Sequence, residues 1–431
     1  MTDTQMSRAT FKSVFAVREF GVLFSGMLMF ILGFEFEILG LSVLVYAQTR
    51  SGFLASVAFS TGFMPQAVGG AFLTSLADRL PPRLVITAGL LTRATPGLII
   101  GLWPALPVPA MLAMVAVAAM ATPVFIAATS GLLPDVLDAD RYILGRSIFS
   151  MTDSGVQIAG LGIGGGILAL LSARWLLLAA GVSLVVAAVV MRVGLRPRPA
   201  RSGAARVRGT VRATVTGNVE LLVLRPVRGL LLAQWLPVWF ATGAEALIIP
   251  YTVSLGHPSG AAGPLLAAVP GGMLLGDLLI GRFCPLAWRK RLAFPLALLL
   301  GAPLLILVLR PPLLIAGVAL FISGCGYAYQ LGIQQAFLDS LPSRLRGQAF
   351  GLRTTGSMGG QGLVPAAVGG VAATLGPAPA MAIAGTIAML TALALHGTLS
   401  GHTASGASRR TGSRKGTPAP SLSARDGRTT R

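Results

Sequence analysis

The sequence predicts an all-α membrane protein with twelve transmembrane helices in two six-helix halves, related by a pseudo-two-fold axis along the membrane normal. Three observations lead to this prediction: an apolar composition, twelve long apolar runs and an internal repeat. Of the 431 residues, 54% are hydrophobic and only 11% are charged. A soluble protein of this length could not cover its surface with so few charged residues, so we expect the chain to lie in a membrane.

Twelve apolar runs are each long enough to cross the hydrocarbon core as a helix, which takes about 20 residues. The first run is too long for the apolar region of a signal peptide and lacks a small-x-small cleavage site, so we expect it to be a permanent span. The predicted spans are residues 20–47, 53–77, 84–103, 108–131, 149–171, 174–195, 229–255, 262–284, 292–309, 312–338, 348–375 and 377–399.

The internal repeat joins a glycine pair to an apolar stretch and a basic turn. Gly69–Gly70 and Arg79 form the first copy, and Gly271–Gly272 and Arg282 form the second, 202 to 203 residues later. So long an offset indicates duplicated halves, because a solenoid would repeat about every 20–50 residues. Six spans per half is an even number, so the halves have the same orientation in the membrane.

Composition divides the chain into five parts. It turns polar and basic between the sixth and seventh spans, and the last residues are rich in Ser, Thr, Gly and Arg. The predicted parts are a cytoplasmic N-terminus (1–19), an N-terminal half (20–195), a basic cytoplasmic linker (196–228), a C-terminal half (229–399) and a disordered basic cytoplasmic tail (400–431).

The net charge of +20 is distributed unevenly along this topology. Basic residues gather in the N-terminus, in the loops after even-numbered spans and in the tail, whereas the opposite loops hold only Arg50, Arg174 and Arg310. The positive-inside rule then places both termini in the cytoplasm. We expect the protein to span the inner (plasma) membrane of the cell several times. The charge therefore gives no reason to expect a nucleic-acid partner. We expect a monomer that contacts the lipid bilayer and a small amphipathic substrate.

The two cysteines, Cys284 and Cys325, lie in or beside predicted spans without the spacing of metal ligands. We therefore expect neither a disulfide framework nor a metal site.

Three acidic residues stand near the middle of predicted spans. Glu35 and Glu37 lie in the first span, and Glu245 lies in the first span of the second half. Each costs at least about 2.5 kcal/mol on insertion scales, so each needs a partner, a water-filled cavity or a task. Arg93, at similar depth in the third span, should have Glu35, Glu37 or Asp153 beside it. Two interpretations remain open: Glu35 or Glu37, together with Glu245, carries a coupling proton, or Glu35 or Glu37 forms a structural ion pair with Arg93.

Polar residues in the tenth span are candidates for the substrate cavity. Tyr327, Gln330 and Gln334 could hydrogen-bond a substrate, although polar residues in membranes also join neighbouring helices.

These features resemble the major facilitator superfamily. The turn after the second span is similar to the family pattern Gly-x-Leu-Ala-Asp-Arg-x-Gly-Arg-Lys, with Leu76-Ala77-Asp78-Arg79 and Arg83 as matches and Thr74 and Pro81 at glycine positions. The resemblance implies that Asp78, Arg79 and Arg83 form a latch that gates the transporter. The simpler alternative is a turn that ends a helix.

A glycine motif in the fifth span is similar to the family's antiporter pattern Gly-Pro-x-x-Gly-Gly. Gly160, Gly164 and Gly165 match it, with Leu161 in place of proline. Gly369–Gly370 take the corresponding place in the eleventh span, and we expect all five glycines to pack helices closely. The whole pattern, over about residues 15–399, resembles the twelve-span branch that exports drugs and metabolites.

The expected function is proton-coupled export of small amphipathic molecules by alternating access, driven by the proton gradient without a cofactor. An uptake permease on the same fold is the main alternative. A non-transporting sensor or scaffold is less favoured, because the sequence shows no further folded domain. An intramembrane enzyme is not expected, because the sequence has no HExxH or GxSxG motif.

Overall fold

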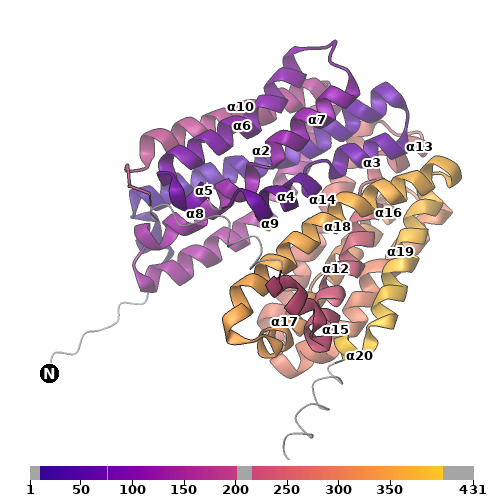
Figure 1. Cartoon of the computed structure of the whole chain (residues 1–431). Helices are drawn as coiled ribbons and strands as arrows, with labels where there is room; N and C mark the ends of the chain where they lie inside the picture. The colour runs from indigo at the N-terminus through magenta and orange to yellow at the C-terminus, as the bar shows by residue number, and fades with distance from the viewer. Residues whose placement is uncertain (1–9, 75, 201–215, 401–431) are drawn as a thin grey trace, which may run out of the picture.

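The computed structural model describes residues 10–74, 76–200 and 216–400. Across these residues the regular secondary structure is entirely helical. Figure 1 shows the helices in two halves, one formed by α2 to α10 and the other by α12 to α19.

Twelve successive helical segments, counted over the described residues, occupy the twelve predicted spans. The first half holds α2 (Arg18–Thr49), α3 (Gly52–Ser60) with α4 (Phe63–Phe72), α6 (Pro82–Leu102), α7 (Val108–Ala119) with α8 (Thr122–Val136), α9 (Ala139–Leu170) and α10 (Ala173–Gly194). The second half holds α12 (Arg225–Glu245) with α13 (Ile248–Ser254), α14 (Ala262–Leu278), α15 (Leu286–Gly301) with η3 (Ala302–Leu309), α16 (Leu313–Gly326) with α17 (Tyr329–Ser340), α18 (Arg346–Leu375) and α19 (Pro377–Ala394).

The short helices lie between or beside these segments. They are α1 (Phe11–Phe15), α5 (Leu76–Arg79), η1 (Ser259–Ala261), η2 (Leu279–Phe283), η4 (Ser343–Leu345) and α20 (His396–Leu399), and residues 216–223 are also helical. By length and composition, nine of the segments in the described part of the chain could cross a membrane as apolar helices. The other three are α3–α4, α9 and α18, and the first turns of α9 and α18 carry charged and small polar residues.

Four of the spans are interrupted near their middle. The interruptions separate α3 from α4, α7 from α8, α12 from α13 and α16 from α17. Proline explains three of them, because it has no N–H to donate to the carbonyl one turn earlier. Pro65, Pro123 and Pro250 each stand in the first turn after the interruption, where a helix tolerates proline.

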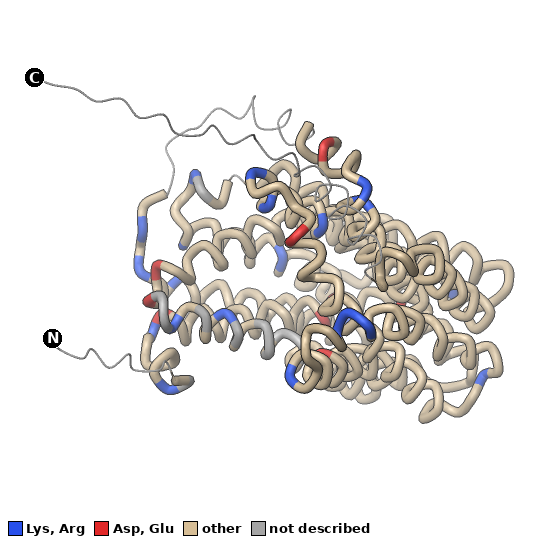
Figure 2. The backbone as a smooth tube through the Cα atoms, turned by 90° about the horizontal axis from the view of Figure 1, so that it is seen from below, with Lys and Arg blue, Asp and Glu red and all other residues tan. Residues whose placement is uncertain are grey.

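The bundle has two distinct ends. The end that holds α1 and α20 is called the termini end below. The opposite end, called the loop end, holds turns at Arg50, Gly256, Arg310 and Gly376, all with φ between 51° and 88°. Figure 2 shows that most Lys and Arg residues gather toward the termini end.

Two pairs of spans join the halves: α9 packs against α14, and α3–α4 packs against α18. At Gly165 of α9, an added Cβ would lie only 2.9 Å from the Cα of Gly263 in α14. At Gly369 of α18, an added Cβ would lie 2.8 Å from the Cβ of Ser56 in α3. The backbones therefore meet closely near the loop end, where an apolar cluster runs continuously through both halves.

Toward the termini end, some glycines of these helices meet no neighbouring helix among the described residues. A Cβ added at Gly155 of α9 or at Gly351 of α18 would meet no atom within 4 Å. Figure 1 accordingly shows α8 and α17 far apart, whereas α3 and α18 lie side by side. The halves are thus closed at the loop end and diverge toward the termini end.

The predicted division into five parts stays a prediction. Helix α10 ends at Gly194 and α12 begins at Arg225, which leaves a long connection between the halves. Residues 201–215 of the predicted linker and 401–431 of the predicted tail lie outside the described residues.

The glycine contact at the loop end makes a prediction about stability. Gly165→Ala adds a methyl group that α14 can accommodate only by moving away, which costs about 1–3 kcal/mol. Gly166→Ala is the matched control, because a methyl group there meets no atom within 4 Å and should stabilise the helix by roughly 0.5–1 kcal/mol. Thermal unfolding of the purified protein in detergent should show a lower midpoint for Gly165→Ala than for Gly166→Ala. Equal midpoints would contradict the close contact.

Candidate functional site

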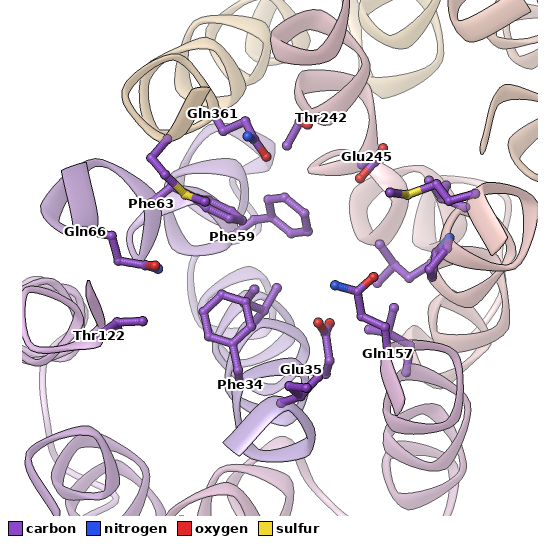
Figure 3. Close-up of a pocket in the computed structure, with 18 of the residues that line it drawn as sticks. Phe34, Glu35, Phe59, Phe63, Gln66, Thr122, Gln157, Thr242, Glu245 and Gln361 are labelled. Carbon is purple, nitrogen blue, oxygen red and sulfur yellow. The ribbon is translucent and has the colours of Figure 1, made fainter. Parts of the chain in front are cut away.

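A cavity of about 370 Å³ lies between the two halves. Helices α2, α3, α4, α8 and α9 line it from the first half, and α12, α14, α16 and α18 line it from the second half. Its walls are mostly aliphatic and aromatic, and Figure 3 shows Phe34, Phe59 and Phe63 among them. The polar residues of the lining are Glu35, Gln66, Thr122, Gln157, Thr242, Glu245, Tyr327 and Gln361.

Helix interruptions place four of these polar residues. Gln66 stands in the first turn of α4, Thr122 begins α8, Glu245 ends α12 and Tyr327 follows the last residue of α16. Non-helical backbone inside a membrane is tolerated where it is buried in protein or faces a cavity. The interrupted spans therefore bring polar side chains and polar backbone groups to the depth of the cavity.

Glu245 and Tyr327 form a hydrogen-bonded pair on the second half. The Tyr327 hydroxyl donates to Glu245 Oε1 at 2.8 Å, and both side chains line the cavity. The structure therefore places Tyr327, which the sequence indicated as a cavity residue, beside one of the three predicted carboxyl groups.

Glu35 presents the second carboxyl group to the cavity. It is 5% exposed and lies in the wall formed by α2, where Gly160 of α9 packs against it. Figure 3 shows that the Glu35 carboxyl and the Gln157 amide point toward the same part of the cavity. Of the described residues that line the cavity, none is Lys, Arg or His.

Glu37 lies behind the cavity wall, paired with Arg93. Arg93 Nη2 approaches Glu37 Oε1 to 3.0 Å, and the two side chains are only 1% and 3% exposed. The guanidinium also lies 5.6 Å from the ring centre of Phe34, which itself lines the cavity. Of the three acids expected beside Arg93, the structure places Glu37 there. The side chain of Asp153 lies outside the described residues.

The glycine predictions hold at four of five positions. Gly160, Gly164 and Gly165 of α9 and Gly369 of α18 all leave less than 3.3 Å between an added Cβ and a neighbouring helix. The prediction for Gly370 is wrong: it is exposed, and a Cβ there would meet nothing within 4 Å. Consecutive residues point about 100° apart on a helix, so Gly369 and Gly370 cannot both face α3.

Gln330 and Gln334 do not line this cavity, and Gln334 is exposed. At about 1.5 Å per residue, they lie about 4.5 and 10.5 Å beyond Tyr327 along the tenth span toward the termini end. Their contact with a substrate stays a prediction.

Five polar cavity residues were not predicted: Gln66, Thr122, Gln157, Thr242 and Gln361. The signal that could have found the three glutamines is an isolated amide within an apolar span. Gln66 Nε2 and Thr122 Oγ1 are buried and have no hydrogen-bond partner among the described residues. Leaving such a group unpaired costs about 1–3 kcal/mol, so an occupant of the cavity that bonds to them would be stabilised.

The turn after the second span contains the one-turn helix α5, which ends at Arg79. Arg83, in the first turn of α6, lines a polar pocket at the termini end with Arg18, Glu19 and Asp135. The side chain of Asp78 lies outside the described residues, so the predicted latch stays a prediction.

The buried pair makes a prediction about folding. Arg93→Met leaves the Glu37 carboxylate unpaired, and Glu37→Gln leaves the guanidinium unpaired, so each should cost about 3–5 kcal/mol. The double variant Arg93→Met/Glu37→Met removes both charges and should recover much of this loss. The amount of folded protein after membrane extraction and the thermal unfolding midpoint measure the effect. If the double variant loses as much as the two single variants together, the pair does not hold the helices as proposed.

Comparisons with known proteins agree with this architecture. No curated protein matches the sequence. Among solved structures, peptide transporter POT in complex with sulfate is similar over 90% of this chain and 95% of its own, with a TM-score of 0.71 and 15% identity. A POT family transporter in complex with a thioalcohol-conjugated peptide is similar over 88% of this chain and 95% of its own, with a TM-score of 0.68 and 13% identity.

A variant of nucleoside transporter NupG is similar over 88% of this chain and 99% of its own, with a TM-score of 0.68 and 12% identity. At such identities the likeness shows the fold alone. The family model of the Major Facilitator Superfamily, however, matches residues 20–365 of the sequence itself. The chain is therefore a multi-pass membrane transporter, not an enzyme, and belongs to the Major Facilitator Superfamily.

Proposed function

We propose that the protein exports small amphipathic molecules in exchange for protons. The observation that supports this most is the cavity between the halves, which combines apolar walls with two carboxyl groups, Glu35 and Glu245. In this family of folds the substrate binds near the midplane between the repeats, and rocking of the halves exposes it to each side in turn. The cavity and the one-sided closure of the bundle fit that cycle.

The lining favours a neutral or cationic solute over an anion. Two carboxyl groups face the cavity, and none of the described lining residues is basic. Aromatic rings on α2, α3 and α4 offer apolar contact and can also attract a cation. An amphipathic amine of modest size would satisfy both parts of the lining.

The charge at the two ends indicates the side from which this state of the cavity opens. Basic residues gather at the termini end, which the positive-inside rule assigns to the cytoplasm. The structure is closed at the loop end, so its cavity would then load from the cytoplasm. Uptake uses the same two states in the opposite order, and the experiment below separates the two directions.

Glu35 and Glu245 are the proposed proton carriers. They lie on the first span of each half, and each can hold either a proton or a cationic solute. Glu37 is less suited to this role, because its carboxylate faces a buried arginine. One proton moved by about 100 mV and one pH unit supplies roughly 3.7 kcal/mol, enough for a several-hundredfold gradient of a neutral solute.

The same proposal gives roles to the latch and to the oligomeric state. Asp78, Arg79 and Arg83 would stabilise one state of the gating cycle from the cytoplasmic side. Because one chain lines the whole cavity, a monomer suffices for transport. No cofactor is proposed, since the proton gradient supplies the energy.

Transport into inside-out membrane vesicles tests this function. With an acidified lumen, vesicles that contain the protein should accumulate ethidium, an aromatic cation, and a protonophore should release it. Glu35→Gln and Glu245→Gln should each abolish accumulation but keep downhill exchange of ethidium, because glutamine resembles the protonated carboxyl group. The matched control is Glu220→Gln at the surface, which should accumulate ethidium normally.

Two results would count against the proposal. If both cavity variants accumulate ethidium like the wild type, the carboxyl groups do not couple transport to protons. If a range of amphipathic solutes leaves the vesicles when the lumen is acidified, the protein is an uptake permease.

A further inference from the structure

The Gln66 side chain enters the cavity without any hydrogen-bond partner among the described residues. It is 8% exposed, and its Nε2 atom is fully buried. Thr122, which is 2% exposed, carries a buried hydroxyl group that is also unpaired among the described residues. Buried polar groups in proteins are nearly always hydrogen-bonded, so two such groups in one cavity wall indicate a missing partner.

Close packing between α4 and the start of α8 brings these two residues to the same wall. The backbone of Gly69 in α4 meets the backbone of Met120, just before α8. Gly70 contacts Pro123, the second residue of α8. Gln66 is three and four residues before this glycine pair, so it lies on the same face of α4. Figure 3 shows Gln66 and Thr122 together on one side of the cavity.

The carboxyl groups belong to a different part of the lining. Figure 3 shows Glu35 and Glu245 across the cavity from Gln66 and Thr122, with Phe34 and Phe59 between them. The cavity is therefore polar at two separate places, one acidic and one uncharged, with aromatic contacts between them. A solute that fills it would carry a different group at each place.

We propose that Gln66 and Thr122 form an uncharged hydrogen-bonding subsite that recognises a carboxamide or hydroxyl group of the transported solute. A glutamine amide offers two donors and an acceptor, and a threonine hydroxyl offers one donor and two lone pairs. A carboxamide or hydroxyl group can both donate hydrogen bonds to Gln66 and Thr122 and accept hydrogen bonds from them, whereas an apolar group leaves both side chains unpaired. The inference rests on the proposed function, since it concerns the same transport cavity.

The other amides of the cavity are less suited to this recognition. Gln361 Nε2 already donates to Ser357 Oγ at 2.8 Å, one turn earlier on α18. Gln157 points toward the part of the cavity that holds Glu35. Gln361 therefore provides a control of the same residue type in the same cavity.

The experiment compares two series of aromatic cations. One series has a 4-carbamoylphenyl group joined by two to six methylenes to trimethylammonium, and the other has a 4-isopropylphenyl group of similar shape in its place. Binding of each compound to the purified full-length protein in lipid nanodiscs is measured by titration calorimetry. For the best chain length, the wild type should bind the carboxamide about three- to tenfold more tightly than the isopropyl compound.

The variants show where this preference arises. Gln66→Leu and Thr122→Val should each remove most of the preference while keeping affinity for the isopropyl compound. Thr122→Ser should keep the preference because it keeps the hydroxyl group, and this variant also shows that the site tolerates substitution. Gln361→Leu should leave the ratio of the two affinities unchanged.

Three results would overturn the subsite. They are equal affinity of the wild type for both series, an unchanged preference in Gln66→Leu and Thr122→Val, and no binding of either series to the wild type. The last result would show that the cavity takes other solutes, or only water at Gln66 and Thr122. Proton-driven accumulation of ethidium would still support the proposed function in each case, so the two proposals can fail separately.

Discussion

The close contact between the backbones of α9 and α14 determines how the two halves can meet. Gly165 and Gly263 allow the helices to approach at the loop end without side chains between them. A hydrocarbon environment gives helices no hydrophobic reason to associate, so packing of small residues is a main source of attraction. Because this contact and the one at Gly369 lie near one end only, the halves diverge toward the other end and leave a cavity.

Interrupted helices supply the polar groups of this cavity. The fourth span of each half is interrupted, at Met120–Ala121 and at Tyr327–Ala328, and each interruption brings a hydroxyl group to the lining. The two cavity carboxyl groups likewise stand on the first span of each half. The repeat thus produces similar positions with different chemistry, since Glu245 bonds to Tyr327 whereas Thr122 has no partner among the described residues.

Sequence patterns predicted the features that depend on local composition. Apolar length gave the twelve spans, and the depth of Arg93 showed that an acid had to lie beside it. The pattern could not choose between Glu35 and Glu37, because that choice depends on how α2 is rotated against α6. The sequence of the tenth span alone likewise could not show that Tyr327 lines the cavity whereas Gln330 and Gln334 do not, because the limits of the cavity depend on how both halves pack.

Gln66 stands out only as an isolated amide in an apolar span, and Thr122 is not unusual in its own span, so neither residue was predicted to line the cavity. Their importance comes from the glycine pair of α4, which meets α8 where proline shortens the helix. The sequence showed Gly69–Gly70 as part of the internal repeat. That this pair brings Gln66 into the cavity is evident only from the position of α8 in the structure.

The most direct test of alternating access is to lock the loop end. A Cβ added at Gly52 would lie 3.9 Å from the Cβ of Ala372, a separation typical of disulfides, so Gly52→Cys with Ala372→Cys should form a disulfide across the halves. Cys284→Ser and Cys325→Ser remove the native thiols. We expect oxidation to stop proton-driven ethidium accumulation and reduction to restore it, while ethidium still binds from the termini end. Full accumulation in the cross-linked protein, with the single-cysteine variants unaffected by oxidation, would contradict a cycle in which the loop end must open.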